Sequence, residues 1–243
     1  MTVTRQDFED SIAAYWGQKV IQLENSKIAG AVGSGTAGSV RGGQHFDAIA
    51  ALLAKFFVDA GYPASSIRLR KGDKLELPGY YRPQKQWDLV VEYEGVLVAA
   101  FELKALGGPS FGNNYNNRVE EALGSAVDLR RAAISDLYPG ERPWLGYFFI
   151  MQDAEGSRRP VRLTHGAAVP PERIWEGASY QRRFAIFCER LLAEQLYDSV
   201  CFVTSSPEDP TPIEPARGID WNHFSAGISA RIQYLKELGY PGE

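Results

Sequence analysis

Cysteine and histidine are scarce in this sequence, and their scarcity excludes several kinds of site. The 243 residues include two cysteines, Cys188 and Cys201, with no CxxC pair. They cannot build a disulfide framework or a cysteine metal site, so we expect reduced thiols in the core. The three histidines, His45, His165 and His223, are far apart and lack metal-ligand spacing. Each is therefore expected to be structural or at the surface.

Long apolar runs, targeting signals and net positive charge are absent too. No run approaches the roughly 18 apolar residues of a membrane span, and the N-terminus MTVTRQDFEDSIAAYW lacks a signal-peptide core. We therefore expect a cytoplasmic protein without a membrane partner. The net charge of −4 argues against a protein that coats nucleic acid non-specifically. A locally basic cleft remains possible, since basic residues cluster in 68–85 and 158–162, although each cluster is also compatible with a solvated face.

The glycine-rich segment GAVGSGTAGSVRGG (30–43) lacks the Gly-Lys-Ser/Thr that a P-loop requires and is predicted to be a loop. Apolar periodicity predicts helices over 6–25, 46–60, 118–133, 180–195 and 221–238, and strands over 89–93, 96–103, 144–151 and 199–204, with 67–77 extended. For the third helix, Asn117 is the expected N-cap and Glu120 its capping-box partner. Helices flank a central group of strands with no clear boundary, which predicts one α/β domain over 1–243.

Charged residues interrupt two apolar runs in the segment WDLVVEYEGVLVAAFELKAL (87–106). Glu102 and Lys104 are two residues apart on a predicted strand, so they share a face about 7 Å apart. Whether Asp88 joins them depends on the turn at Glu94-Gly95. A two-residue loop would place Asp88 opposite Phe101, whereas a three-residue loop or a bulge would place it opposite Glu102. We expect the three-residue loop or a bulge.

Two carboxylates that converge on one point repel each other unless a cation or a proton lies between them. Oxygen ligands with open coordination positions suit Mg²⁺, and a neighbouring lysine can orient or deprotonate water and stabilise charge on phosphorus. Asp88, Glu102 and Lys104 therefore form a candidate site for phosphodiester hydrolysis. The same pattern would also arise from salt bridges across a hairpin. A glycosidase needs paired carboxylates too, but the adjacent lysine disfavours that interpretation.

The run GGPSFGNNYNNR (107–118) places four asparagines and an arginine directly after this candidate site; they are Asn113, Asn114, Asn116, Asn117 and Arg118. Asparagine can pair bidentately with adenine in the major groove, and arginine with guanine. These side chains would then read bases beside the cleaved phosphate. Turn and capping roles are the alternative, because asparagine favours both.

Several segments together resemble the XhoI family of type II restriction endonucleases, which has the PD-(D/E)xK nuclease fold. The resemblance lies in LPGYYRPQKQWD (77–88), FELK (101–104), GPSFGNNYNNRVEEALGSAVDL (108–129) and PWLGYFF (143–149), with support from SRRPVR (157–162), GASYQRRFAIFCERL (177–191) and, more loosely, RGGQHFDA (41–48). Two departures are that Trp87 stands where the general fold motif has proline, and that the region after Arg162 is shorter and diverged.

The resemblance implies a PD-(D/E)xK core, in which helices flank a central mixed β-sheet. It implies Asp88, Glu102 and Lys104 as the catalytic residues, with Mg²⁺ held by Asp88, Glu102 and the carbonyl of Leu103. The implied activity is cleavage of double-stranded DNA by a homodimer at a palindrome, CTCGAG or a related sequence, leaving 5′ overhangs. A cognate DNA methyltransferase would act on the same site in a restriction-modification system.

Further DNA contacts are expected outside the asparagine run, from Arg82, Lys85, Arg158, Arg159 and Arg162. Asp47 is either an auxiliary carboxylate near the metal or a cap at the start of a helix, which we favour. Two other functions stay open: a structure-specific or repair nuclease of the same fold, and a DNA-binding protein without catalysis.

Overall fold

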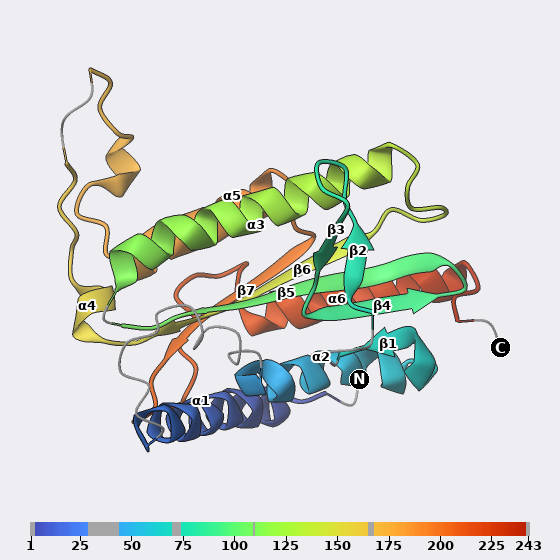
Figure 1. Ribbon diagram of the computed structural model, residues 1–243, viewed down its shortest axis with the longest axis horizontal. Helices are drawn as coiled ribbons and strands as arrows, with labels where there is room; N and C mark the ends of the chain where they lie inside the picture. The colour runs from blue at the N-terminus through green and yellow to red at the C-terminus, as the bar shows by residue number, and fades with distance from the viewer. Residues whose placement is uncertain (1–2, 29–43, 70–73, 109, 165–167, 242–243) are drawn as a thin grey trace.

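The computed structural model describes residues 3–28, 44–69, 74–108, 110–164 and 168–241 (Figure 1). The predicted glycine-rich loop at 30–43 lies outside these residues. The helices and strands, in chain order, are α1 (Arg5–Ile28), α2 (Asp47–Asp59), β1 (Ile67–Arg68), β2 (Glu76–Pro78), β3 (Gln84–Gln86), β4 (Leu89–Tyr93), β5 (Val96–Leu106), α3 (Phe111–Ile134), β6 (Trp144–Gln152), α4 (Glu155–Arg158), α5 (Tyr180–Ala193), β7 (Ser199–Ser205) and α6 (Trp221–Glu237), with single 3₁₀ turns at Gln44–Phe46, Ala64–Ser66 and Arg173–Trp175.

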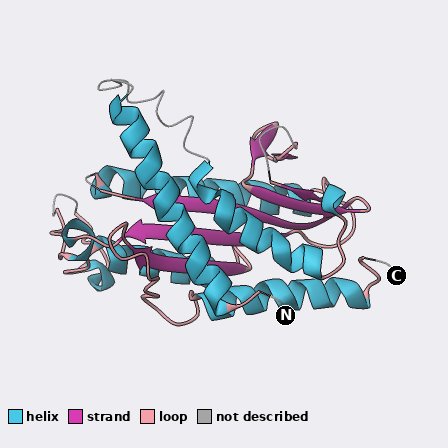
Figure 2. Cartoon of the chain, turned by 90° about the horizontal axis from the view of Figure 1, so that it is seen from below, coloured by secondary structure: helices cyan, strands magenta, loops and turns pink. Residues whose placement is uncertain are grey.

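A five-stranded sheet in the order β1-β4-β5-β6-β7 forms the centre of the fold. The β1/β4 and β4/β5 pairs are antiparallel, whereas the β5/β6 and β6/β7 pairs are parallel. Strands β2 and β3 pair separately as a small antiparallel hairpin. Helices α3 and α5 cover one face of the sheet, and α1, α2 and α6 lie on the other (Figures 1 and 2). The predicted α/β class with a central mixed sheet is confirmed.

Side-chain alternation along the strands fills two cores, one on each face of the sheet. Phe101 and Phe148 point to the α1, α2 and α6 side, while Ala100, Tyr147 and Phe149 point to the α3 and α5 side. All five side chains are fully buried. Both faces of the central strands are therefore apolar, as expected for parallel strands covered by helices on both sides.

The two cysteines behave as the sequence predicts. Cys188 on α5 and Cys201 on β7 are both buried and free. The favoured role of Asp47 as a helix cap was wrong, because Phe46 is the N-cap of α2 and no side chain caps this end. Asp47 is an exposed residue in the first turn, where its negative charge interacts favourably with the helix dipole. None of the described helices has the length and apolar character needed to cross a membrane.

The prediction for the start of the third helix was wrong. Helix α3 begins at Phe111 rather than at Arg118, so Asn117 lies inside the helix and is not its N-cap. Phe111 is buried and stacks on Tyr180 of α5 with ring centroids 6.1 Å apart. Burial of an aromatic ring contributes more than the modest capping preference of asparagine, so tertiary packing extends the helix through the asparagine run.

The β4–β5 hairpin contains the predicted bulge. Its turn is the two-residue loop Glu94-Gly95, with positive φ at both residues, 49° and 79°. This is the geometry of a type I′ turn. The register then shifts, and Val98 is the extra residue on β5. Because of that extra residue, Leu89 pairs with Phe101, and the preceding position, Asp88, comes opposite Glu102.

Arg231 of α6 supports the bulge from the other side of the sheet. Its side chain is buried, and its Nε donates to the Val98 carbonyl at 3.1 Å. Its Nη2 donates to the Arg142 carbonyl at 3.0 Å. A bulge leaves backbone groups outside the regular ladder, and Arg231 supplies the donor that the Val98 carbonyl needs.

We therefore predict that Arg231→Met lowers the free energy of unfolding by about 1–3 kcal/mol, the cost of a buried acceptor that loses its donor. Urea denaturation measures the loss. Arg217→Met, at an exposed arginine, is the matched control and is expected to change stability by less than about 0.5 kcal/mol. Equal stability of the two variants would contradict a role for Arg231 at the bulge.

Candidate active site

Asp88 and Glu102 meet at the edge of the β4–β5 ladder. Asp88 directly precedes β4, and its backbone N–H donates to the Phe101 carbonyl at 3.1 Å. Its carboxylate accepts from the Leu103 backbone N–H at 2.8 Å. These two bonds fix Asp88 beside β5 and turn its carboxylate towards the strand. The bulge at Val98 thus produces the convergence of carboxylates that the sequence predicted.

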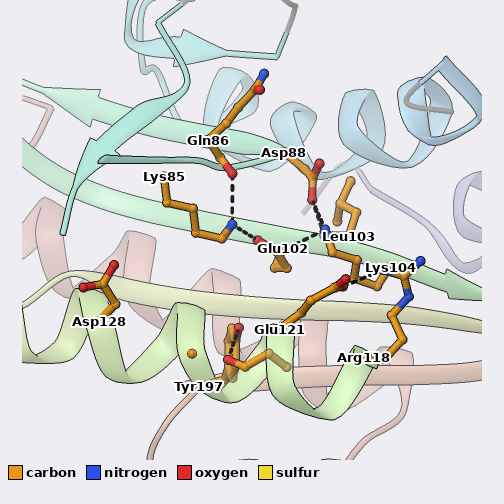
Figure 3. Close-up of polar contacts among 12 residues, drawn as sticks. Lys85, Gln86, Asp88, Glu102, Leu103, Lys104, Arg118, Glu121, Asp128 and Tyr197 are labelled. Carbon is orange, nitrogen blue, oxygen red and sulfur yellow. Dashed lines mark hydrogen bonds and ion pairs between the residues drawn. The ribbon is translucent and has the colours of Figure 1, made fainter. Parts of the chain in front are cut away.

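Lys104 joins the two carboxylates. Its Nζ lies 2.5 Å from Glu102 Oε1 and 3.4 Å from Asp88 Oδ2 (Figure 3). Since one ammonium group reaches both carboxylates, a single cation position exists between Asp88 and Glu102. The structure therefore brings together all three residues that the sequence predicts to be catalytic.

Lys85 is a fourth member of this site. It extends from β3, and its Nζ forms an ion pair with Glu102 Oε2. It also donates to the Gln86 carbonyl at 2.9 Å and lies 4.3 Å from the centre of the Trp87 ring. From the sequence we expected Lys85 only as a DNA contact. No periodicity could place it here, because β3 and β4 belong to different sheets and the chain changes direction between them.

The charges of this site depend on one another. Burial alone would raise the pKa of Glu102, whose side chain is 3% exposed, but Lys104 and Lys85 outweigh burial and hold that pKa below its usual value. The Asp88 side chain is 38% exposed. Partial burial raises the pKa of Asp88, Lys104 lowers it and Glu102 raises it further. The net result is a pKa above the usual value for aspartate. Burial would lower the pKa of Lys104, but the two carboxylates raise it.

An aromatic layer lies beneath Glu102. Tyr147 pairs with Glu102 across β5 and β6, and it is fully buried. Its hydroxyl has no hydrogen-bond partner in the part of the chain that the structure describes. Tyr197 is buried beside it, with ring centroids 5.1 Å apart, and donates to the Ala122 carbonyl at 3.1 Å. Low polarity under Glu102 strengthens every electrostatic interaction that its carboxylate makes.

The donor set suits magnesium better than zinc. Within the described ranges no group of three or more His, Cys, Asp or Glu side chains could hold a metal. Asp88 and Glu102 are the two carboxylates on hand, and the Leu103 carbonyl is a neighbouring backbone oxygen. A structural zinc site would require four protein ligands of the nitrogen and sulfur type. Magnesium binds through one or two carboxylates and keeps several waters or phosphate oxygens, so the residues present fit it.

The predicted base-reading asparagines lie on the first turns of α3. Asn113, Asn116 and Asn117 are exposed, and Asn114 is half-buried. Positions 113, 116 and 117 are three and four residues apart, so they share one helical face. Arg118 is tied to the end of β5, because its Nε donates to the Ala105 carbonyl at 3.3 Å. The run is thus a helical surface beside the site rather than a loop.

Arg82 holds the β2–β3 hairpin against α3. Its Nε lies 2.7 Å from Asp128 Oδ2, and its Nη2 donates to the Gly124 carbonyl at 3.3 Å. Asp128 also accepts from the backbone N–H groups of Tyr80 and Tyr81, at 2.8 and 2.7 Å. Although Arg82 was predicted as a DNA contact, its charge is already engaged in positioning the hairpin that carries Lys85.

The remaining predicted arginines lie around α4. Arg158 pairs with Asp153 at 3.3 Å. Arg159 is exposed and lines a pocket together with Asn113 at the start of α3. Arg162 is exposed and lines a second pocket, formed by the segment that follows α4. Of the predicted DNA contacts here, the structure thus brings Arg159 and Asn113 together.

Comparison with known proteins gives consistent matches. The sequence profile of the family described as "Restriction endonuclease XhoI" matches residues 25–213. The chain is 38% identical over 190 residues to the type II restriction enzyme BstVI of Geobacillus stearothermophilus, covering 75% of this chain and 83% of the relative. It is 37% identical over 187 residues to the type II restriction enzyme XhoI of Xanthomonas vasicola, covering 74% and 72%. It is also 35% identical over 164 residues to the type II restriction enzyme AbrI of Azospirillum brasilense, covering 65% and 73%. No solved structure matches the chain.

The pKa of Asp88 is raised and that of Glu102 is lowered. Neutral substitutions at the two positions are therefore expected to change the stability of the protein in opposite directions. Folding disfavours the charged form of Asp88, so Asp88→Asn is expected to raise the urea midpoint at pH 8 without divalent metal. This gain should shrink as the pH falls through the raised pKa, because wild-type Asp88 then becomes neutral as well. Folding favours charged Glu102, so Glu102→Gln should lower stability by about 2 kcal/mol at pH 8. Shifts in the same direction would contradict this charge distribution.

Proposed function

The chain belongs to the XhoI family of restriction endonucleases, and on that premise we propose that Asp88, Glu102 and Lys104 are the residues with which it hydrolyses DNA. Type II restriction enzymes are site-specific deoxyribonucleases, and this chain is one of them. The observation that carries the proposal is the position of the Lys104 ammonium, within reach of both carboxylates at the edge of the sheet.

In this proposal Asp88, Glu102 and the Leu103 carbonyl hold a divalent cation, Mg²⁺ being the best match to an all-oxygen set. Bound there, the ion would polarise a phosphate oxygen and lower the pKa of a coordinated water. The Leu103 N–H fixes the Asp88 carboxylate at 2.8 Å, and the buried aromatic layer excludes water beneath Glu102. Both features would keep the ligands in position before DNA arrives.

Lys104 would orient the attacking water and stabilise negative charge on the phosphate. The two carboxylates raise its pKa, so it is protonated at neutral pH. A protonated lysine donates hydrogen bonds and cannot accept a proton from water. In the metal-free site this supports orientation and charge stabilisation; a cation bound to the two carboxylates would weaken the interactions that raise the pKa of Lys104.

Lys85 would neutralise Glu102 until a cation binds. Its ammonium covers Glu102 Oε2 while Lys104 covers Oε1. A cation that binds to Glu102 therefore competes with both ammonium groups, and with Lys85 directly where it takes Oε2. Once displaced, Lys85 remains at the site on the hairpin that Arg82 anchors, where it could contact a phosphate of the DNA, as predicted from the sequence.

The proposal extends to the rest of the activity predicted from the sequence. We propose cleavage at a palindrome, CTCGAG or a related sequence, by a homodimer whose two-fold symmetry matches that of the site. Cleavage would leave 5′ overhangs. The exposed asparagines of α3 and the pocket shared by Asn113 and Arg159 are the proposed base-reading surface. The site would belong to one domain over 1–243, in a cytoplasmic protein whose cognate methyltransferase protects the same sequence.

Digestion of phage DNA with Mg²⁺ tests the proposal. The wild-type protein is expected to yield discrete fragments with identical 5′ overhangs, which sequencing of the ends would define. Asp88→Asn and Lys104→Met should bind the mapped site and cut it at least about 10²-fold more slowly, because the first removes a ligand of the cation and the second removes the charge that stabilises the phosphate. Lys236→Met, at an exposed lysine in the last turn of α6, is the control and should cut normally.

Three other outcomes would count against the proposal. A smear would indicate a nuclease without sequence specificity. Intact DNA with a gel shift would indicate a binding protein without catalysis. Normal cutting by Asp88→Asn or Lys104→Met would place the active site elsewhere.

Competition between Lys85 and the metal makes a separate prediction. In the absence of DNA, Lys85→Met should bind Mn²⁺ more tightly than wild type, by roughly tenfold, since no ammonium then covers Glu102 Oε2. Electron paramagnetic resonance of free Mn²⁺ measures this affinity directly. Lys55→Met, at a lysine paired with Asp59 on α2, is the matched control. Unchanged affinity in Lys85→Met would show that Lys85 does not occupy the metal's position.

A further inference from the structure

Lys19 is a cation on α1, close to the end of β5. Its Nζ lies 5.7 Å from the centre of the Tyr15 ring, 4.9 Å from that of the Trp16 ring, and 3.4 Å from the Tyr15 hydroxyl. The side chain is half-buried. Burial lowers the pKa of Lys19, and the neighbouring Arg118 lowers it further. Two positive groups therefore face the same region from α1 and α3.

The charge of Lys19 lacks a counter-charge among the residues that the structure describes, because no carboxylate there comes within ion-pair distance of it. The aromatic rings attract the ammonium but carry no net charge. The chain has no Asp or Glu from Asn25 to Phe46, so the segment that follows α1 cannot supply a carboxylate either. A partly desolvated ammonium without an anion is unfavourable, and an anion from outside the chain would relieve this cost.

The Lys19 ammonium packs against Gly107, at the end of β5. A Cβ built on Gly107 would lie 3.0 Å from Lys19 Nζ and 3.2 Å from Gln152 Oε1, so even a methyl group would press on the lysine. Gln152 in turn accepts from the Gly108 backbone N–H at 3.1 Å, which holds this short turn in place. The close approach of Lys19 to the turn after β5 thus requires a residue without a side chain at position 107.

Lys19 lies close to the proposed active site, because it contacts the residue that follows β5. Gly107 follows Lys104 by three residues along the β5 direction, a separation of about 10 Å. One strand of duplex DNA carries a phosphate every ~3.4 Å along its axis, so a phosphate a few nucleotides from the cleaved one would fall at this distance. Figure 2 shows the C-terminal half of α1 and the β2–β3 hairpin extending beyond the same edge of the sheet.

We propose that Lys19 binds a backbone phosphate of the DNA beside the cleaved phosphate. Arg118 lies nearby, but its charge is already paired with Glu121, so Lys19 is the cation that would make this contact. The inference rests on the proposed function and extends it, because the family profile matches from residue 25 and does not include Lys19. Lys19 would contribute affinity and orientation without reading sequence, since a phosphate contact carries no base information.

Salt dependence of DNA binding tests this assignment. In an Asp88→Asn background, which prevents cutting, affinity for a duplex with the mapped site is measured from 50 to 200 mM salt. Adding Lys19→Gln should reduce the slope of log K against log salt by about 0.9, the value for one lost phosphate contact. It should weaken binding to a scrambled duplex by the same factor. Lys19→Arg should keep the wild-type slope.

The control and the contrary outcomes separate this inference from the proposed function. Lys236→Gln removes the same charge from the last turn of α6 and should leave the slope unchanged. An unchanged slope in Lys19→Gln, in a protein that binds and whose wild type cuts, would overturn the role of Lys19 alone. Loss of affinity for the mapped site only would make Lys19 a base contact and overturn it too. Wild-type protein that neither binds nor cuts DNA would overturn both proposals.

Discussion

Glu102 places a carboxylate on the central strand of the sheet, where almost no water reaches it, and the cost of burying that charge explains what surrounds it. A buried charge is tolerated only when it is paired and hydrogen-bonded. Lys104 supplies one partner from the same strand, and Lys85 supplies another from the separate β2–β3 hairpin. Because each oxygen of the Glu102 carboxylate has an ammonium group, Glu102 stays charged without a metal. Both ammonium groups occupy positions that a cation or a phosphate could use.

The bulge at Val98 brings the members of this charge cluster together, because it sets the register of β4 against β5. Without the extra residue, the two-residue turn would put Asp88 opposite Phe101, and the two carboxylates would lie on different faces of the sheet. Arg231 satisfies the carbonyl of the bulge from the opposite core. A contact between α6 and β5 thus supports the convergence of Asp88 and Glu102. Packing on the α6 face of the sheet is in this way linked to the proposed active site on the α3 face.

The sequence predicted those features that depend on local patterns. Alternation on a strand placed Glu102 and Lys104 on one face, and apolar runs with turn residues located the hairpin. Features that depend on tertiary contacts were not predictable. The start of α3 depends on stacking of Phe111 on Tyr180, and the place of Lys85 depends on how a small hairpin folds back over β5. Neither contact has a periodic signal, because the partners come from different elements and meet only in the folded chain.

The distribution of charge also bears on how such a protein can bind DNA. The chain has 26 basic and 30 acidic residues, so at long range it repels a polyanion. Lys85, Lys104 and Arg118, with Lys19 beyond them, converge near the end of β5, two of them facing carboxylates that a metal would neutralise. In the proposed mechanism, a divalent cation bound to Asp88 and Glu102 would free the lysines and increase the positive potential at this place. Attraction of DNA to the site would then depend on the metal, and every other orientation of the acidic protein would be disfavoured.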